Sequence, residues 1–236
     1  MRADRDPGPS LARRCLAEAT GTAFLLAAVV GSGVMADRLC GGNVAVALLA
    51  NAVATGGALV ALILAFGATS GAHLNPAVSA LLAARGELRR GDLAPYVAAQ
   101  LFGAACGTAA AHLMFGEPAF AASTHVRAGF AQAFSEGVAT AGLLLTIVLC
   151  GRARPEATPF AVAGYIVAAY WFTASTSFAN PAVTLARCLT DTFSGIRPSD
   201  VPGFLAGQAA GGAAAWGLLA FLAPPDGAAA LQRTSP

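Results

Sequence analysis

The sequence reads GAHLNPAVSALL at residues 71–82 and SFANPAVTLARC at residues 177–188, so Asn-Pro-Ala-Val occurs twice. Asparagine is a good N-cap residue, and proline is favoured at the first position of a helix. Each copy therefore predicts the start of a helix. The apolar stretches that follow, about 75–84 and 180–190, are too short to cross a bilayer, which needs about 20 residues. Both copies thus predict short helices that enter apolar surroundings without spanning them.

The composition places most of the chain in lipid. Of the 236 residues, 56% are hydrophobic and only 11% are charged, and the mean hydropathy is +0.65. Soluble domains carry roughly 25% charged residues. No basic stripe with interleaved aromatic residues is present, so the sequence predicts no nucleic-acid partner. The five cysteines lack C-x-x-C spacing and have no histidine cluster beside them, so we expect no metal site, no cofactor and no disulfide framework.

Apolar stretches long enough to span a membrane occur six times. The basic N-terminal segment leads straight into the first of them with no clear cleavage site, so we interpret that stretch as a retained helix. The expected fold is an all-α membrane protein with six transmembrane helices and two re-entrant half-helices. The predicted spans are 15–36, 43–67, 92–115, 128–150, 157–178 and 201–223.

Arginine placement predicts the topology. With six spans, ten arginines fall on the side of the two termini and four fall on the other side, namely Arg38, Arg127, Arg187 and Arg197. Loops on the cytoplasmic side carry the excess of basic residues. We therefore expect both termini in the cytoplasm of a multi-pass protein of the cell inner (plasma) membrane. The first short helix then enters from the cytoplasm and the second from outside.

The two halves of the chain repeat each other. Glu18 in AEATGTAFLL corresponds to Glu136 in SEGVATAGLLL, and Gln100 in AAQLFGAACG corresponds to Gln208 in AGQAAGGAAA. Each half holds three spans and one short helix, and an odd number of spans forces the halves into opposite orientations. Inverted repeats place their site at the midplane, where discontinuous helices meet.

The two short helices would meet end to end near that midplane. Each helix start carries about half a positive charge and unpaired N–H groups, and irregular backbone at this depth must be buried or line a water-filled cavity. We predict an electropositive constriction that hydrogen-bonds water and hydroxyl oxygens and repels cations, including hydrated protons.

These motifs resemble the aquaporin and glycerol-facilitator family, the major intrinsic proteins, over about 13–223. That resemblance implies a single channel domain at 13–223, with repeats at about 13–115 and 128–223, a cytoplasmic N-terminal tail at 1–12 and a cytoplasmic C-terminal tail at 224–236. It implies a pore in every subunit and a homotetramer. The residues assigned to the central constriction are Asn75, Pro76, Ala77, Asn180, Pro181 and Ala182.

Two further sets of residues have two readings each, and a third has one. Intramembrane carboxylates such as Glu18 and Glu136 suggest a proton relay by default; the family favours a structural role, in which each accepts hydrogen bonds from a re-entrant loop. His73 corresponds to a family histidine that lines the cytoplasmic half of the pore, sometimes as a pH-sensitive gate, and it could instead pack the loop. The Gly-x-x-x-Gly pairs at 103–107 and 207–211 favour close helix packing.

The outer filter departs from the family pattern. Most members follow the second motif directly with an arginine, and Val183 stands there in this chain. Counting without gaps from each motif places the other three filter residues at Thr55, Ala168 and Ser177. All four are small, and pore width and lining groups decide selectivity. We therefore expect a wide, mostly uncharged filter with two hydroxyls.

Arg187 lies four residues after Val183, hence about one helical turn further out on the same face. One hypothesis places its charge in the outer vestibule, where it gathers anionic or polar solutes. The alternative is a helix-end arginine that reaches the interface or pairs with Asp191 at i+4.

The predicted function is a passive channel for water and small neutral solutes. Glycerol, urea, arsenite, antimonite and methylated arsenicals fit the filter, and NPAVTLAR resembles a bacterial branch with a non-arginine filter linked to arsenic handling. The alternative is a secondary transporter, because inverted repeats also build carriers. Enzyme activity is not expected: an intramembrane hydrolase needs a nucleophile next to a base, and only Ser32 and His112 are candidates.

Overall fold

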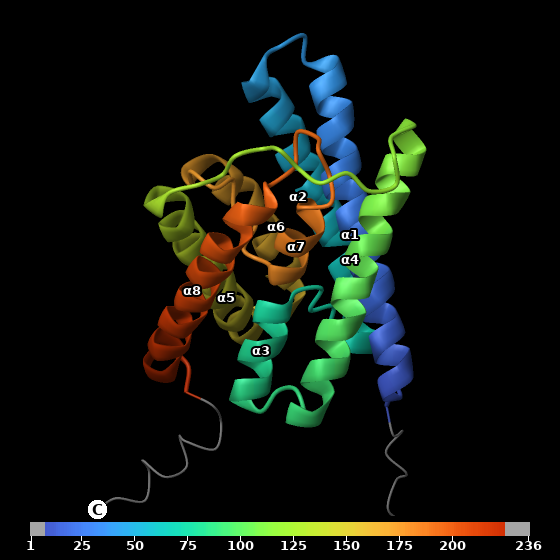
Figure 1. The fold of residues 1–236 in the computed structure, drawn as a ribbon. Helices are drawn as coiled ribbons and strands as arrows, with labels where there is room; N and C mark the ends of the chain where they lie inside the picture. Colours follow the sequence, from blue (N-terminus) through green and yellow to red (C-terminus); the bar gives the residue numbers. More distant parts are fainter. Residues whose placement is uncertain (1–7, 225–236) are drawn as a thin grey trace, which may run out of the picture.

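The structure is a computed structural model that describes residues 8–224, and within that range every regular element is helical (Figure 1). The all-α prediction is confirmed. The long helices are α1 (Leu11–Leu39), α2 (Val44–Ser70), α4 (Leu93–Phe115), α5 (Phe130–Ala153), α6 (Thr158–Phe172) and α8 (Val201–Leu222), the short ones are α3 (Pro76–Arg85) and α7 (Pro181–Arg187), and single 3₁₀ turns are η1 (Arg90–Asp92), η2 (Pro155–Ala157) and η3 (Pro198–Asp200).

Five of the described long helices are apolar and long enough to cross a membrane, and α6, with 15 residues, is shorter. The predicted span 157–178 is therefore wrong at its C-terminal end. Helix α6 ends at Phe172, and Thr173 adopts an extended conformation that starts a loop toward the core. Hydropathy alone cannot separate a helix from an apolar loop that the protein itself buries.

The predicted N-terminal tail, 1–12, overlaps the first residues of a helix. Helix α1 begins at Leu11, and the Ser10 hydroxyl caps it by accepting a hydrogen bond from the backbone N–H of Arg13 at 3.4 Å. Residues 1–7 and 225–236 lie outside the described residues, so most of both predicted tails does too.

Glycines bring the helices of each half into close contact. Helix α1 packs on α4, and a methyl group added at Gly103 or Gly107 would collide with the backbone oxygen of Ala19 or Ala23. Helix α5 packs on α8 in the same way, because Gly207 and Gly211 face backbone oxygens of α5. Backbones can approach this closely only where a side chain is missing, so each glycine pair sets the spacing of its half.

The half-helices α3 and α7 occupy opposite halves of the bundle (Figure 1). Helix α3 lies toward the end at which α1 begins and α8 ends, which we call the N/C end. Helix α7 lies toward the other end, marked by the α1–α2 connection, which we call the hairpin end. Both half-helices start near the middle of the bundle, as the inverted repeat predicts.

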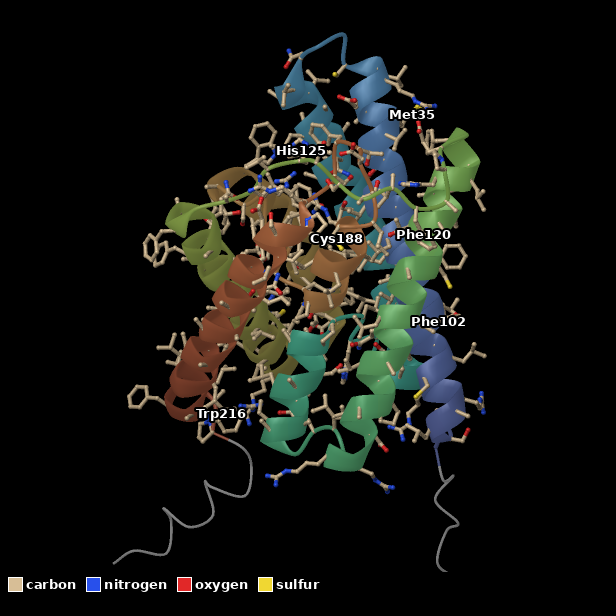
Figure 2. The ribbon with its side chains drawn as sticks, viewed as in Figure 1. Met35, Phe102, Phe120, His125, Cys188 and Trp216 are labelled. Atoms are coloured by element: carbon tan, nitrogen blue, oxygen red, sulfur yellow. The ribbon has the colours of Figure 1, made fainter. Side chains whose placement is uncertain are left out.

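Large apolar side chains cover the outside of this bundle. Figure 2 shows Phe102 on the outer side of α4 and Trp216 near the lower part of α8, and these residues are 69% and 41% exposed. A lipid-facing surface accounts for such exposure, since hydrocarbon solvates apolar side chains. The polar groups gather in the interior, where the site lies.

Candidate functional site: a pore through the bundle

The two motif asparagines join the halves at the centre. The Asn75 side chain caps α3 by accepting from the N–H of Ala77 at 2.8 Å, and its Nδ2 donates to the backbone oxygen of Ala179 at 2.8 Å. The Asn180 side chain caps α7, and its Nδ2 donates to the backbone oxygen of Leu74, also at 2.8 Å. An amide NH₂ has two donor hydrogens, so each asparagine retains one for a passing oxygen atom.

The loops before both half-helices share an unusual backbone. In the first loop Ala72 and Leu74 have φ of 47° and 50°, and in the second Ser177 and Ala179 have φ of 51° and 48°. Non-glycine residues rarely occupy this left-handed region, and they persist there only where the surroundings hold them. The same conformation at equivalent positions shows that the repeat extends to the backbone of both re-entrant loops.

Glu18 holds the first loop in place. Its carboxylate is fully buried and accepts hydrogen bonds from the backbone N–H groups of His73 and Leu74, at 2.9 and 2.7 Å. The Ser70 hydroxyl and Gln100 Nε2 donate to it as well, at 2.6 and 2.7 Å. Four donors around one carboxylate provide the compensation that a buried charge requires.

Glu136 does the same for the second loop. This fully buried carboxylate accepts from the backbone N–H groups of Phe178 and Ala179, both at 2.8 Å, and from Gln208 Nε2 at 2.6 Å. These contacts match the structural reading of the two carboxylates. The proton-relay reading would need a free carboxylate oxygen facing a water path, and all four oxygens of the pair are engaged by loop or glutamine donors.

A cavity of about 120 Å³ lies inside the bundle, and residues from both halves of the chain line it. Both motif asparagines line it. Of the other four motif residues, none does: Pro76, Ala77 and Pro181 line a separate apolar groove between α3, α5 and α8, and Ala182 is fully buried in the core. The constriction predicted from the motifs therefore reduces to the asparagine side chains and the loop backbone.

Toward the N/C end the cavity is mainly apolar, with His73 as its main polar side chain. His73 Nδ1 lies 3.0 Å from the Ser79 hydroxyl, and its ring packs against Tyr96 with centroids 5.2 Å apart. His73 thus lines the cavity and also packs against the loop, so its position agrees with both the pore-lining and the loop-packing interpretation. The apolar residues lining this half include Leu82, Leu143, Ile147 and Val162.

Toward the hairpin end the lining becomes polar. Thr55, Ser177 and Val183 all line the cavity, as the filter assignment expects. Ala168 does not, because its side chain is exposed on the outside of α6. Tyr170 takes the position instead, and its hydroxyl lies 3.3 Å from Thr55 Oγ1.

The Ala168 placement is corrected for a physical reason. Counting back from the second motif without gaps assumes a regular path, but α6 ends at Phe172 and the loop that follows has left-handed residues. The register of α6 against that loop cannot be read from spacing. With Tyr170 in place of Ala168, the filter contains three hydroxyls, those of Thr55, Tyr170 and Ser177. An aromatic residue with a polar tip near the end of this helix was the sequence feature that could have indicated Tyr170.

Arg187 lies inside the cavity wall. Its side chain is 2% exposed, its Cζ lies 3.5 Å from the centroid of the Phe178 ring, and its Nε donates to the backbone oxygen of Ser194. The predicted alternative, an ion pair with Asp191, is wrong. The Asp191 carboxylate is exposed and instead accepts from the backbone N–H and the hydroxyl of Thr124, at 2.7 and 2.9 Å.

The two hydrolase candidates are engaged elsewhere. Ser32 Oγ donates to the backbone oxygen of Ala28 at 2.5 Å, and His112 binds the backbone oxygen of Pro118 and the hydroxyl of Thr190. They share no contact, so the structure does not bring a nucleophile and base together at this pair.

Paired half-helices that meet at two asparagines, with a cavity inside the bundle, define the class of protein. The sequence profile of the major intrinsic protein family matches residues 8–163, and the chain belongs to this family. It is therefore a multi-pass integral membrane protein, and its family consists of channels for water and small solutes. Nothing in the comparisons supports the carrier alternative.

Particular relatives narrow this assignment. The chain is 55% identical over 226 residues to aquaglyceroporin AqpS of Rhizobium meliloti (strain 1021), with 96% of each chain covered. It is 34% identical over 181 residues to aquaporin AqpM of Methanothermobacter thermautotrophicus, covering 67% of this chain and 72% of that protein. The X-ray structure of the aquaglyceroporin from Plasmodium falciparum is similar in fold, with a TM-score of 0.67, 22% identity, and coverage of 91% of this chain and 98% of that one.

Proposed function

We propose that this protein is a passive channel that conducts water and uncharged polar solutes of the size of glycerol and urea. The observation that carries the proposal is the outer half of the cavity, where Thr55, Tyr170 and Ser177 offer hydroxyls around the uncharged Val183. Hydroxyls can replace the hydration of a polyol, and a valine leaves more width than an arginine. The similarity to a protein named an aquaglyceroporin supports the same solute class.

Uncharged metalloid acids belong to the proposed solute class. Arsenite and antimonite present hydroxyl groups much as glycerol does, and methylated arsenicals add an apolar face that suits Val183 and the apolar lining toward the N/C end. Protons are excluded even without a filter arginine, because the half-helix starts and the amide donors of Asn75 and Asn180 remain at the centre. The protein has no enzymatic activity and needs no cofactor.

We also propose a homotetramer in the cell inner membrane with both termini in the cytoplasm, so the hairpin end faces outside. The arginine distribution supports this orientation: Arg85 and Arg14 lie near the N/C end, where Arg85 contacts the C-terminal end of α8 and Arg14 pairs with Asp92. The family resemblance supports the tetramer.

Stopped-flow light scattering on reconstituted protein tests the solute class. Permeability to water, glycerol, urea and arsenite is compared between the wild type, Val183→Arg and the size-matched control Val183→Thr. We expect Val183→Arg to lower glycerol and urea permeability by about tenfold or more, equivalent to about 1.4 kcal/mol, and to reduce water permeability less. The control should retain all four.

Two outcomes would contradict the proposal. If Val183→Arg leaves the larger solutes unaffected, Val183 does not form the filter. If the initial flux of glycerol saturates and depends on a co-transported ion, rather than rising linearly with concentration in ion-free proteoliposomes, the protein is not a passive channel.

A further inference from the structure

Two arginines from distant segments face one aromatic ring at the hairpin end of the cavity. The Cζ atom of Arg187, on α7, lies 3.5 Å from the centroid of Phe178, and that of Arg127, in the segment between α4 and α5, lies 5.2 Å from it. Phe178 itself lines the cavity. In Figure 2, the chain neighbour Cys188 and the nearby His125 lie in the half of the bundle toward the hairpin end. Two positive charges therefore flank one wall of the outer pore.

Neither guanidinium forms an ion pair with any residue between 8 and 224. Arg127 Nε donates to the backbone oxygen of Gly195 at 2.8 Å, and its Nη1 contacts only oxygens of the second re-entrant loop. The nearby carboxylates are used by other groups, since Asp200 binds Arg197 and the backbone N–H of Arg127. Burial lowers the pKa of the Arg127 guanidinium below its ordinary value, and the interactions with Tyr170 and Glu136 offset that lowering only in part.

Two polar atoms in the cavity wall are buried without a hydrogen-bond partner among the described residues. They are Nη1 of Arg187 and Oγ of Ser177, and both side chains are 2% exposed. Both residues line the same cavity, which the Thr55 and Tyr170 hydroxyls also line. A buried charge without a partner is costly, and arginine cannot shed its proton under ordinary conditions. A ligand with acceptor oxygens would relieve that cost.

We infer that the hairpin end of the cavity is a binding site for a small singly charged oxyanion, whose oxygens accept from Arg187 Nη1 and Ser177 Oγ. A guanidinium presents donors in a fork that matches such oxygens. Arg127 adds a second positive charge behind Phe178. The cavity is enclosed by side chains on several sides, so an anion no larger than the polyols proposed to pass this pore is the ligand class considered.

The bound anion does not continue through the pore in its charged form. Beyond the asparagines the lining is mainly apolar, with Leu82, Leu143 and Ile147, and cannot replace the hydration of a charge. An anion at the outer site instead accepts hydrogen bonds from the hydroxyls with which a polyol would interact. Oxyanions should therefore lower the glycerol permeability. This expectation rests on the proposed channel function.

Formate is the probe for this site, and gluconate, a much larger carboxylate, is the reference anion. Glycerol permeability is measured in proteoliposomes with either sodium salt on both sides at equal ionic strength, so protein orientation does not matter. We expect formate near its dissociation constant to reduce wild-type permeability by about half. Arg187→Gln should abolish the reduction and Arg127→Gln should weaken it. Arg38→Gln, which removes an exposed arginine paired with Glu117, should preserve it.

Equal wild-type permeability in the two salts, or equal inhibition in Arg187→Gln, would overturn the inference while leaving the channel function intact. If Arg187→Gln does not fold, thermal unfolding of the detergent-solubilised wild type decides. A higher unfolding temperature in formate than in gluconate, reduced by added glycerol, supports the site, and an unchanged temperature rejects it. Absence of glycerol flux in gluconate would reject the proposed function instead, and the unfolding measurement would still test the anion site.

Discussion

Replacing Glu136 distinguishes a carboxylate that holds the second re-entrant loop from one that carries protons. Three donors lie within 2.6–2.8 Å of this fully buried group: two backbone N–H groups of the loop and Gln208 Nε2. Each buried donor left unsatisfied costs about 1–3 kcal/mol. Glu136→Ala is therefore expected to destabilise the protein by about 3–9 kcal/mol, a large part of the about 5–15 kcal/mol that is typical of a folded protein.

Glu136→Gln makes the test sharper because it preserves the volume of the side chain. A glutamine oxygen in the place of Oε2 still accepts from the Ala179 N–H and from Gln208 Nε2, while its NH₂ group faces the Phe178 N–H, so one of the three hydrogen bonds is lost. The expected destabilisation is about 1–3 kcal/mol. Thermal unfolding in detergent and glycerol permeability in proteoliposomes should fall together, since a displaced loop also moves Phe178 and Ser177 in the cavity wall.

Glu117→Gln is the matched control. Glu117 pairs with Arg38 at 2.9 Å and both side chains are exposed by 40% or more, so the pair contributes at most about 1 kcal/mol. The reasoning is refuted if Glu136→Gln unfolds at the wild-type temperature and conducts glycerol normally. If that variant also loses a proton-dependent flux that the wild type shows, the proton-relay reading replaces the structural one.

Three further predictions concern packing, the filter and the loop at the hairpin end. Gly103→Ala should lower the unfolding temperature by an amount equivalent to about 1–3 kcal/mol, because the added methyl collides with the α1 backbone, whereas Gly57→Ala, with open space around it, should be neutral or stabilising. Tyr170→Phe should reduce glycerol permeability about fivefold, for one hydrogen bond of about 1 kcal/mol, and water permeability less. The hydrogen bonds from Thr124 lower the pKa of Asp191, so the stability that the Asp191 carboxylate contributes is present above about pH 4 and is lost as the pH falls through the lowered value. Asp191→Asn should therefore reduce the fall in unfolding temperature at acid pH, and it should leave the glycerol flux unchanged.

Each of these has an outcome that contradicts it. Equal unfolding temperatures for the two glycine variants would mean that α1 and α4 can move apart without loss. Unchanged glycerol flux in Tyr170→Phe would remove the tyrosine from the filter. A flux change in Asp191→Asn would revive the excluded pairing between Asp191 and Arg187.

The central part of the site could be predicted from the sequence because its determinants are local. Asn75 and Asn180 are N-caps followed by proline, and the short helices they start are encoded within ten residues of each motif. Glu18 and Glu136 stand out as carboxylates in apolar sequence, and the repeat pairs each with a glutamine. Such signals do not depend on how distant segments meet.

The outer part of the site could not be predicted in the same way. The α6 register against the second re-entrant loop depends on residues in left-handed conformations, so spacing pointed to Ala168 where Tyr170 stands. The partners of Arg187 follow from the same loop, which brings Phe178 under its guanidinium. The sequence shows Arg127 only as a charge in a predicted loop, and no local pattern places it on that ring.

The sequence by itself determined that lipid surrounds this protein and that its two halves form an inverted repeat. Hydropathy requires a helical membrane bundle, and two Asn-Pro-Ala-Val copies in opposite halves require half-helices that meet at the centre, because unpaired backbone cannot face lipid. Only the tertiary structure decided which side chains surround the solute at the hairpin end. There α2, α6, α7, the second re-entrant loop and the α4–α5 segment converge, and contacts among residues far apart in the chain leave no periodic trace in the sequence.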